Sequence, residues 1–377
     1  MRKHYKSNMI MFLTLLFVLA SVFTSVSACA APVVQDAITL PSTIERIEES
    51  AFSGCTGLRT IRIPNTLQAI GENAFADCTG LADVYFSGTQ QEWDRIVIEA
   101  GNAPLLSAAL HFTRIVANGN CGKNGDQVTW ALDSSGLLTI NGNGAMADYW
   151  GVGGNINTPW KQYNSMINEI VVEDGVTALG AYAFFNTSVV QATLPEGLTT
   201  LPHACFCNCV NLCRITLPST LTALDNECLF HTAFTSFTVP ASVTRLNGHF
   251  ISGANTPIVL DVESGNHQYK AMNGAIYTED GKTLMMAPTA GAYSEAVDRS
   301  FVVPDGVSAL GAHAFAYDAY YQDLYLPASI VSVGDYCFVG NMALKNIYFE
   351  GTEQQWAAIL VGSQNSTFTS AEVHFNH

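Results

Sequence analysis

The chain has 377 residues and a formal net charge of −16, with 48% hydrophobic and 13% charged residues. Its acidic residues are spread along the chain and form no tail, which indicates a soluble, self-repelling surface and argues against nucleic acid as a partner. Length decides little about domain number, because repeat arrays grow longer without adding domains.

The first 29 residues have the pattern of a signal peptide. Three basic residues precede an apolar stretch over Met9–Ala20, and a segment rich in Ser, Thr and Ala follows. Two kinds of processing fit, because Ala28-Cys29-Ala30 is a small-x-small cleavage site, while residues 26–29 resemble the lipobox of bacterial lipoproteins, in which Cys29 carries the lipid. No later segment reaches the ~20 apolar residues that span a bilayer. The sequence predicts an exported chain, either secreted or anchored by a lipid at Cys29.

A repeated unit becomes visible when the chain is aligned on its prolines. Pro41 and Pro64 are 23 residues apart, and so are Pro195 and Pro218. A period in the low twenties indicates a leucine-rich-repeat array.

Each unit contains one strand and a return path. Ile61 and Ile63 alternate with an outward residue, as in a half-buried strand, and Pro64 ends the strand because proline has no N–H to give. In Ile70-Gly71 we expect the glycine to permit a tight turn, and Phe75 to fill the space between the two walls. One repeat cannot bury these residues alone. The sequence therefore predicts a solenoid, a right-handed parallel β/α-type superhelix of mostly short strands and turns.

The full unit reads Ile-Pro-x-x-Leu/Val-x-x-Ile/Leu-Gly-x-x-Ala-Phe-x-x-Cys-x-x-Leu, and copies of it begin at Ile63, Leu217 and Leu326. This pattern is similar to the BspA-type (Treponema-type) leucine-rich repeat of bacterial surface proteins, and the similarity covers most of residues 38–377. The resemblance implies a cell-surface or secreted binding protein, and some members of the family are adhesins for host matrix or for other bacteria. Periodicity by itself implies only the solenoid.

One element occurs twice. Phe86-Ser-Gly-Thr-Gln-Gln-Glu-Trp93 leads to His111-Phe112, and Phe349-Glu-Gly-Thr-Glu-Gln-Gln-Trp356 leads to His374-Phe375, 18 residues on in both cases. Each copy follows a final strand, so we interpret it as a C-terminal cap whose Trp covers the last apolar face.

These caps divide the chain. We expect a first array over 37–115, a linker and β-hairpin capping module over 116–166, and a second array over 167–377. In the capping module, Gln127–Leu132 and Leu137–Ile140 flank a turn. A hairpin insertion at about 255–287 interrupts the second array.

Four cysteines lie within nine residues: Cys205, Cys207, Cys209 and Cys213. Repeat alignment places Cys205 in a small-residue slot and Cys209 in an inward slot, where a thiol packs as a hydrophobic group and can donate weakly to a turn carbonyl. We favour structural thiols. A disulfide involving Cys207 and Cys213 and a metal site are the alternatives, although the spacing lacks paired C-x-x-C knuckles.

The sequence contains no His-Glu-x-x-His and no Gly-x-Ser-x-Gly motif. His111 and His374 lie in the repeated cap, where a hydrogen bond within the cap is favoured over a metal or catalytic role. We therefore predict no enzyme, no catalytic or metal-binding residue and no cofactor.

The remaining candidate is an outward column two residues before each repeat proline, continued by two tyrosines where proline is absent. Stacked repeats would align these side chains on one face, and Tyr offers a large contact area at a small entropic cost. The alternative is that Thr and Tyr simply suit strands. The candidate ligand-binding residues are Arg62, Tyr85, Thr193, Thr216, Thr238, Tyr325 and Tyr348.

Together these features predict a non-enzymatic cell-surface or secreted protein that binds a protein or glycan partner, such as host extracellular matrix or other cells. Its contact with the membrane would be limited to an N-terminal lipid. The alternative is an architectural stalk of the cell envelope, in which the solenoid sets a distance and has no ligand of its own.

Overall fold

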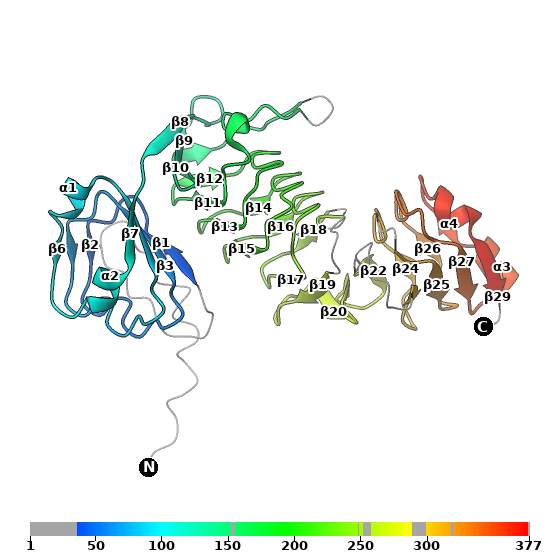
Figure 1. Ribbon diagram of the computed structural model, residues 1–377. Helices are drawn as coiled ribbons and strands as arrows, with labels where there is room; N and C mark the ends of the chain where they lie inside the picture. The colour runs from blue at the N-terminus through cyan, green and yellow to red at the C-terminus, as the bar shows by residue number, and fades with distance from the viewer. Residues whose placement is uncertain are drawn as a thin grey trace, which may run out of the picture. The chain divides into compact units, whose positions relative to one another are not determined.

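The computed structural model describes residues 36–151, 155–247, 249–251, 258–288, 299–317 and 320–375. The predicted signal peptide and Cys29 lie outside these residues. The described chain forms two compact units: residues up to Asn118 with Ala131–Thr139, and Gly119–Trp130 with the residues from Ile140 onward. Both consist of stacked coils of short strands and turns with little helix (Figure 1). The predicted solenoid is confirmed.

The first unit has two parallel sheets, and successive coils contribute one strand to each. One sheet has the order β1-β3-β5-β7 and the other β2-β4-β6, and two short helices lie between strands of the last coil. The elements are β1 (Ala37–Thr39), β2 (Arg46–Ile47), β3 (Thr60–Pro64), β4 (Ala69–Ile70), β5 (Asp83–Ser87), α1 (Gln90–Trp93), β6 (Val97–Ile98), α2 (Ala103–Ser107) and β7 (Ala109–Phe112).

The next sheet along the chain has the order β15-β13-β11-β10-β9-β8, and β12 pairs with β10. Two smaller sheets follow, with the orders β14-β16-β18 and β17-β19. The elements are β8 (Ile115–Asn120), β9 (Gln127–Asp133), β10 (Leu137–Ala145), a 3-10 turn (Lys161–Tyr163), β11 (Glu169–Val172), β12 (Val176–Ala178), β13 (Gln191–Thr193), β14 (Thr200–Leu201), β15 (Arg214–Thr216), β16 (Ala223–Leu224), β17 (Ser236–Val239), β18 (Arg245–Leu246) and β19 (Val259–Val262).

The rest of the second unit contains the sheets β20-β21-β22-β24-β26-β28 and β23-β25-β27-β29. Pairing is antiparallel for β20-β21-β22 and parallel from β22 onward, so a small meander opens this stack. The elements are β20 (Tyr269–Met272), β21 (Ala275–Thr278), β22 (Thr283–Met286), β23 (Ser300–Val302), β24 (Ala309–Leu310), β25 (Asp323–Leu326), β26 (Ser332–Val333), β27 (Asn346–Phe349), α3 (Glu353–Ala357), β28 (Leu360–Val361), α4 (Ser366–Ser370) and β29 (Glu372–Phe375). Within the described residues, no helix is long and apolar enough to cross a membrane.

Parallel pairing keeps equivalent residues of successive coils in register. Ile61 pairs with Val84, and Ile63 pairs with Phe86. All four side chains are buried, whereas the residue between each pair points outward. We use the term strand wall for the outward faces of β1-β3-β5-β7 in the first unit, and of β11-β13-β15, β17-β19 and β23-β25-β27-β29 in the second.

In several coils, the turn after the short second strand bends through two left-handed residues, four positions apart. After β4 they are Asn73 (φ 55°) and Asp77 (φ 58°), and after β2 they are Ser50 (φ 59°) and Gly54 (φ 78°). Gly71 begins this turn, because its carbonyl accepts from the N–H of Ala74 at 3.3 Å, although its own φ is not left-handed. Its lack of a side chain serves close packing, because a Cβ there would lie 2.5 Å from the backbone nitrogen of Glu49 in the preceding coil.

Phenylalanines stack along the inside of these turns. The rings of Phe315 and Phe338 lie 4.9 Å apart and nearly parallel, and Phe368 continues the stack at 5.1 Å. In the first unit the rings of Phe52 and Phe75 lie 5.0 Å apart. Burial of such a ring contributes several kcal/mol, about 3–5 when it is lost to alanine. These rings therefore form much of the solenoid core.

The duplicated end elements each contain two short helices. Helix α1 has a capping box between Thr89 and Glu92, and α3 has the same box between Thr352 and Gln355. Trp93 is nearly buried, with its ring 5.3 Å from that of Phe86. The tryptophan therefore packs on the last core phenylalanine of the array.

Candidate functional site

The candidate column lies on the strand wall, and the pairing register between neighbouring strands determines which of its residues are in contact. Arg62 pairs with Tyr85 in the first unit, and Tyr325 pairs with Tyr348 in the second. Because parallel strands lie about 4.8 Å apart, side chains in register can stack face to face. The structure turns the single predicted column into separate groups, and two of them are ladders of stacked side chains.

The first ladder consists of Arg62, Tyr85 and His111. The guanidinium of Arg62 lies 4.6 Å from the centre of the Tyr85 ring, and the His111 ring stacks on the other face of that tyrosine at 4.6 Å. Nε2 of His111 lies 2.8 Å from a carboxylate oxygen of Asp83. Arg62 also donates to the hydroxyl of Ser135 at 2.6 Å. Every member of this ladder is held by a charged or polar neighbour.

The C-terminal ladder consists of Tyr325, Tyr348 and His374. Its rings stack at 4.6 Å and 4.8 Å, with interplanar angles of 12° and 19°. Tyr325 remains 38% exposed, so the ladder is open to a partner. Val302 occupies the strand position beside Tyr325 and is 62% exposed.

Carboxylates flank the C-terminal ladder on the same face. Asp323 lies two residues before Tyr325 and accepts a hydrogen bond from Nδ2 of Asn346 at 2.6 Å. Glu372 lies two residues before His374, and its side chain is 75% exposed. Partial desolvation, together with the negative charges of Asp323 and Glu372, raises the pKa of the Tyr348 hydroxyl. The face thus has a negative local potential.

The predicted threonines do not form such a ladder. Thr193 pairs with Thr216, and both are exposed, but Thr238 lies on a different sheet and pairs with Asp261. Short hydroxyl side chains offer little contact area. The threonines therefore lie on the strand wall but give a partner little surface to contact.

Sequence reasoning did not include His111, His374 and Val302 in the column. A signal was present for each. The two histidines recur at the same place in the duplicated element, and Val302 precedes Pro304 by the same two residues as the other members. Only the register shows that both histidines stack on the neighbouring tyrosine.

The cysteine cluster is buried in the turns. Cys205, Cys207 and Cys209 are buried free thiols, and Cys213 is an exposed one. Sγ of Cys209 donates to the carbonyl of Phe184 at 3.0 Å, as expected for a structural thiol. Burial raises the pKa of the Cys209 thiol to about 11 and that of Cys207 to about 12. Over the described ranges, no group of three or more His, Cys, Asp and Glu could hold a metal ion.

A second cluster of ionisable groups lies at the turns of the second unit. The side chain of His249 is 3% exposed, with Nε2 3.3 Å from the Glu227 carboxylate and Nδ1 3.3 Å from Nδ1 of His313. The hydrogen bond with His249 is the main cause that lowers the pKa of Glu227, and burial is the main cause that lowers the pKa of His313. The His313 ring in turn stacks on Tyr336. We assign this cluster a packing role.

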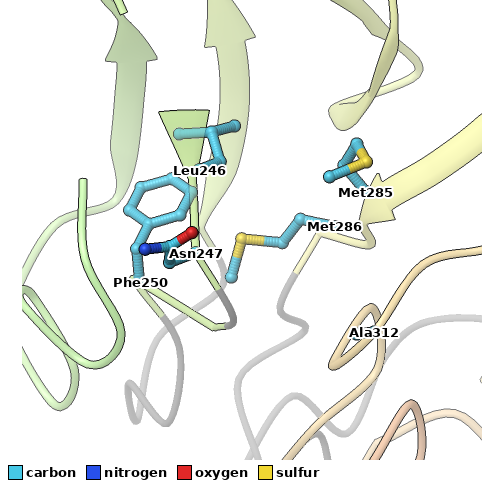
Figure 2. Close-up of a pocket in the computed structure, with 6 residues that line it drawn as sticks. All are labelled: Leu246, Asn247, Phe250, Met285, Met286 and Ala312. Atoms are coloured by element: carbon cyan, nitrogen blue, oxygen red, sulfur yellow. The ribbon is translucent and has the colours of Figure 1, made fainter. Parts of the chain in front are cut away.

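A small pocket lies in the second unit (Figure 2). It has a volume of about 210 Å³ and mostly apolar walls, with the side chains of Met285 and Met286 opposite those of Leu246 and Phe250. Sites for small molecules usually have about 300–1,000 Å³ and several converging polar groups. Asn247 is the one polar side chain among the residues that line this pocket. The strand-wall ladders are therefore the stronger candidate.

Comparisons with known proteins agree with the repeat pattern. The family model described as BspA type leucine rich repeat region matches in six copies over residues 33–96, 162–256 and 291–358. No curated protein matches the chain.

Comparison with solved structures finds several that resemble parts of this chain. A leucine-rich-repeat protein from Eubacterium ventriosum is 20% identical, with a TM-score of 0.46, over 63% of this chain and 73% of that one. The pneumococcal vaccine antigen PcpA is 17% identical, with a TM-score of 0.40, over 82% of this chain and 60% of PcpA. A leucine-rich cell surface protein from Faecalibacterium prausnitzii is 20% identical, with a TM-score of 0.37, over 86% of this chain and 90% of that one.

Proposed function

Because this chain belongs to the BspA-type leucine-rich-repeat family, we propose that it is an exported, non-enzymatic binding protein that acts as an adhesin through its strand wall. The partner is a protein or glycan outside the cell. The BspA-type repeat is typical of bacterial surface proteins, so membership of this family supports a location at the cell surface. A signal-peptide pattern in the first 29 residues agrees with export.

The observation that carries the proposal is the pair of stacked ladders. Both end in a histidine on a tyrosine, at the same register position of the last strand in each array. Stacking restricts the side chains before any partner arrives, so binding costs little additional entropy. Aromatic anchors of this kind often contribute a large share of the binding energy in protein interfaces.

The test is binding of the purified chain, expressed with its own leader, to an array of extracellular-matrix proteins and glycans. The triple variant Tyr85→Ala, Tyr325→Ala, Tyr348→Ala should bind its ligand at least about tenfold more weakly, the loss typical of aromatic anchors. Tyr317→Ala with Tyr336→Ala is the matched control, because these half-exposed tyrosines lie at the turns and not on the strand wall.

A folded chain that binds nothing on the array would favour the architectural stalk. Saturable binding that survives in the triple variant would place the binding surface elsewhere. Equal losses in the triple variant and in the control would show that the effect comes from general loss of structure.

A further inference from the structure

The two ladders differ at their first position, and the difference indicates what the second ladder binds. In the first unit the outer face of Tyr85 is covered by the guanidinium of Arg62 at 4.6 Å. In the second unit the register position of Arg62 is held by Tyr325, and the neighbour of Tyr325 on the preceding strand is Val302. Among the described residues, guanidinium–ring contacts join Arg62 to Tyr85 and Arg299 to Tyr320, and none involves Tyr325.

The geometry leaves ring surface on Tyr325. A valine side chain ends at its Cγ atoms, so it is too short to cover the outer part of a tyrosine ring that extends from the neighbouring strand. The exposures of the two residues, 62% for Val302 and 38% for Tyr325, agree with this. The opposite face of Tyr325 is filled by Tyr348. The uncovered surface is therefore a ring face beside a small apolar residue.

The negative charge around the exposed face of Tyr325 favours a cationic ligand group. Asp323 lies on the same strand face as Tyr325. Glu350, two residues after Tyr348, and Glu372, two residues before His374, are both exposed. A tyrosine face attracts cations through its quadrupole, and a planar guanidinium stacks on it better than an ammonium does. The net charge of −16 adds attraction for a basic partner at longer range.

From these observations we infer that the C-terminal ladder binds an arginine side chain of a partner protein, which stacks on Tyr325 beside Val302 and pairs with the Asp323 carboxylate. The inference rests on the proposed function and narrows its partner from a protein or glycan to a protein segment that presents arginine. The first ladder contains a contact of the same kind, in which its own Arg62 stacks on Tyr85.

The test compares three fluorescein-labelled dodecapeptides, in which glycine alternates with arginine, with lysine or with the neutral isostere citrulline, by fluorescence anisotropy on the purified chain. We expect the arginine peptide to bind more tightly than the lysine peptide, and the citrulline peptide to bind weakest. Binding should weaken as salt rises, because charges at the surface are screened.

The decisive variant is Val302→Arg, which places a guanidinium of the chain itself beside Tyr325, as Arg62 lies beside Tyr85. It should weaken arginine-peptide binding about fivefold or more, because it occupies the ring face and repels the ligand. Val331→Arg is the matched control: it is also an exposed valine, 59% exposed, but it precedes β26 in the other sheet. It adds the same charge and should change affinity less than twofold.

Equal binding of the arginine and citrulline peptides, or equal effects of Val302→Arg and Val331→Arg, would overturn the inference. So would the absence of any arginine-peptide binding. The proposed function is judged separately on the ligand array. If the triple tyrosine variant loses its array ligand while Val302→Arg leaves peptide binding unchanged, the ladder binds a ligand other than arginine. If both variants bind as the wild type does, the proposed function fails as well.

Discussion

The two end elements, residues 86–112 and 349–375, are copies of one structure with different outer surfaces. Their inner contacts agree closely: a phenylalanine under a tryptophan, a capping box at the first helix and a buried asparagine before the second. Their outer contacts differ, because Arg62 stacks on the ladder tyrosine Tyr85 in one unit and Tyr325 stacks on Tyr348 in the other. Packing constrains the inner positions, whereas outward positions are free to diverge with the partner.

The buried asparagine shows how closely the inner contacts agree. Oδ1 of Asn102 accepts from the backbone N–H of Phe75 at 2.9 Å, and its Nδ2 donates to the carbonyl of Gly71 at 2.9 Å. Asn365 makes the same contacts with Phe338 at 3.1 Å and Gly334 at 2.8 Å. Both asparagines satisfy backbone groups of the preceding coil.

The largest effect is expected from the core phenylalanines. Phe75→Ala and Phe338→Ala should each lower the free energy of unfolding by about 3–5 kcal/mol, because each leaves a cavity in a ring stack. Hydrogen exchange read peptide by peptide should report the loss mainly in the unit that carries the change. Phe112→Ala, at a partly exposed ring, is the control and should cost much less. Equal loss of protection in both units would contradict the division into separate cores.

A smaller effect is expected at the asparagines. Asn102→Ala and Asn365→Ala should each cost about 1–3 kcal/mol, because each leaves a buried N–H and carbonyl without a partner. The two values should agree within about 1 kcal/mol if the end elements are equivalent inside. Thermal melts of each variant, with the exposed Asn211→Ala as control, provide the measurement. A large cost at one site alone would show that the two copies are packed differently.

The smallest expected effect is on the pH dependence of folding stability. The second unit contains the His249–His313 pair, and the described part of the first unit has no counterpart of it. The pKa of His313 is lowered in the folded state, so the unfolded chain binds more protons below about pH 6.5, and stability falls as the pH drops through that range. The pKa of Glu227 is lowered too, so its contribution is present above about pH 4.3 and is lost as the pH falls further.

His313→Phe keeps a ring against Tyr336 and removes the titrating group. It should flatten the loss of stability between about pH 7 and pH 5.5, measured as the melting temperature of the second unit. Burial also lowers the pKa of His231, so part of the pH dependence of stability should remain in this variant. His267→Gln, at an exposed histidine, is the matched control. An unchanged slope in His313→Phe would show that the pair does not contribute to it.

The sequence by itself determined the solenoid and the faces of its strands. Period-two alternation around Ile61 and Ile63 and the proline spacing depend only on local geometry and on which residues must be buried, so they are visible without any contact. The inward position of Cys209 followed from repeat alignment for the same reason.

Tertiary structure alone decided which side chains meet across coils. The left-handed turns at Asn73 and Asp77, the close approach at Gly71 and the stacking of His111 on Tyr85 all depend on the register between neighbouring coils. A one-residue shift of that register would move each outward side chain to the inner face. The ladders, and the ring face left open on Tyr325, arise from contacts between residues that are 23 or more positions apart in the chain.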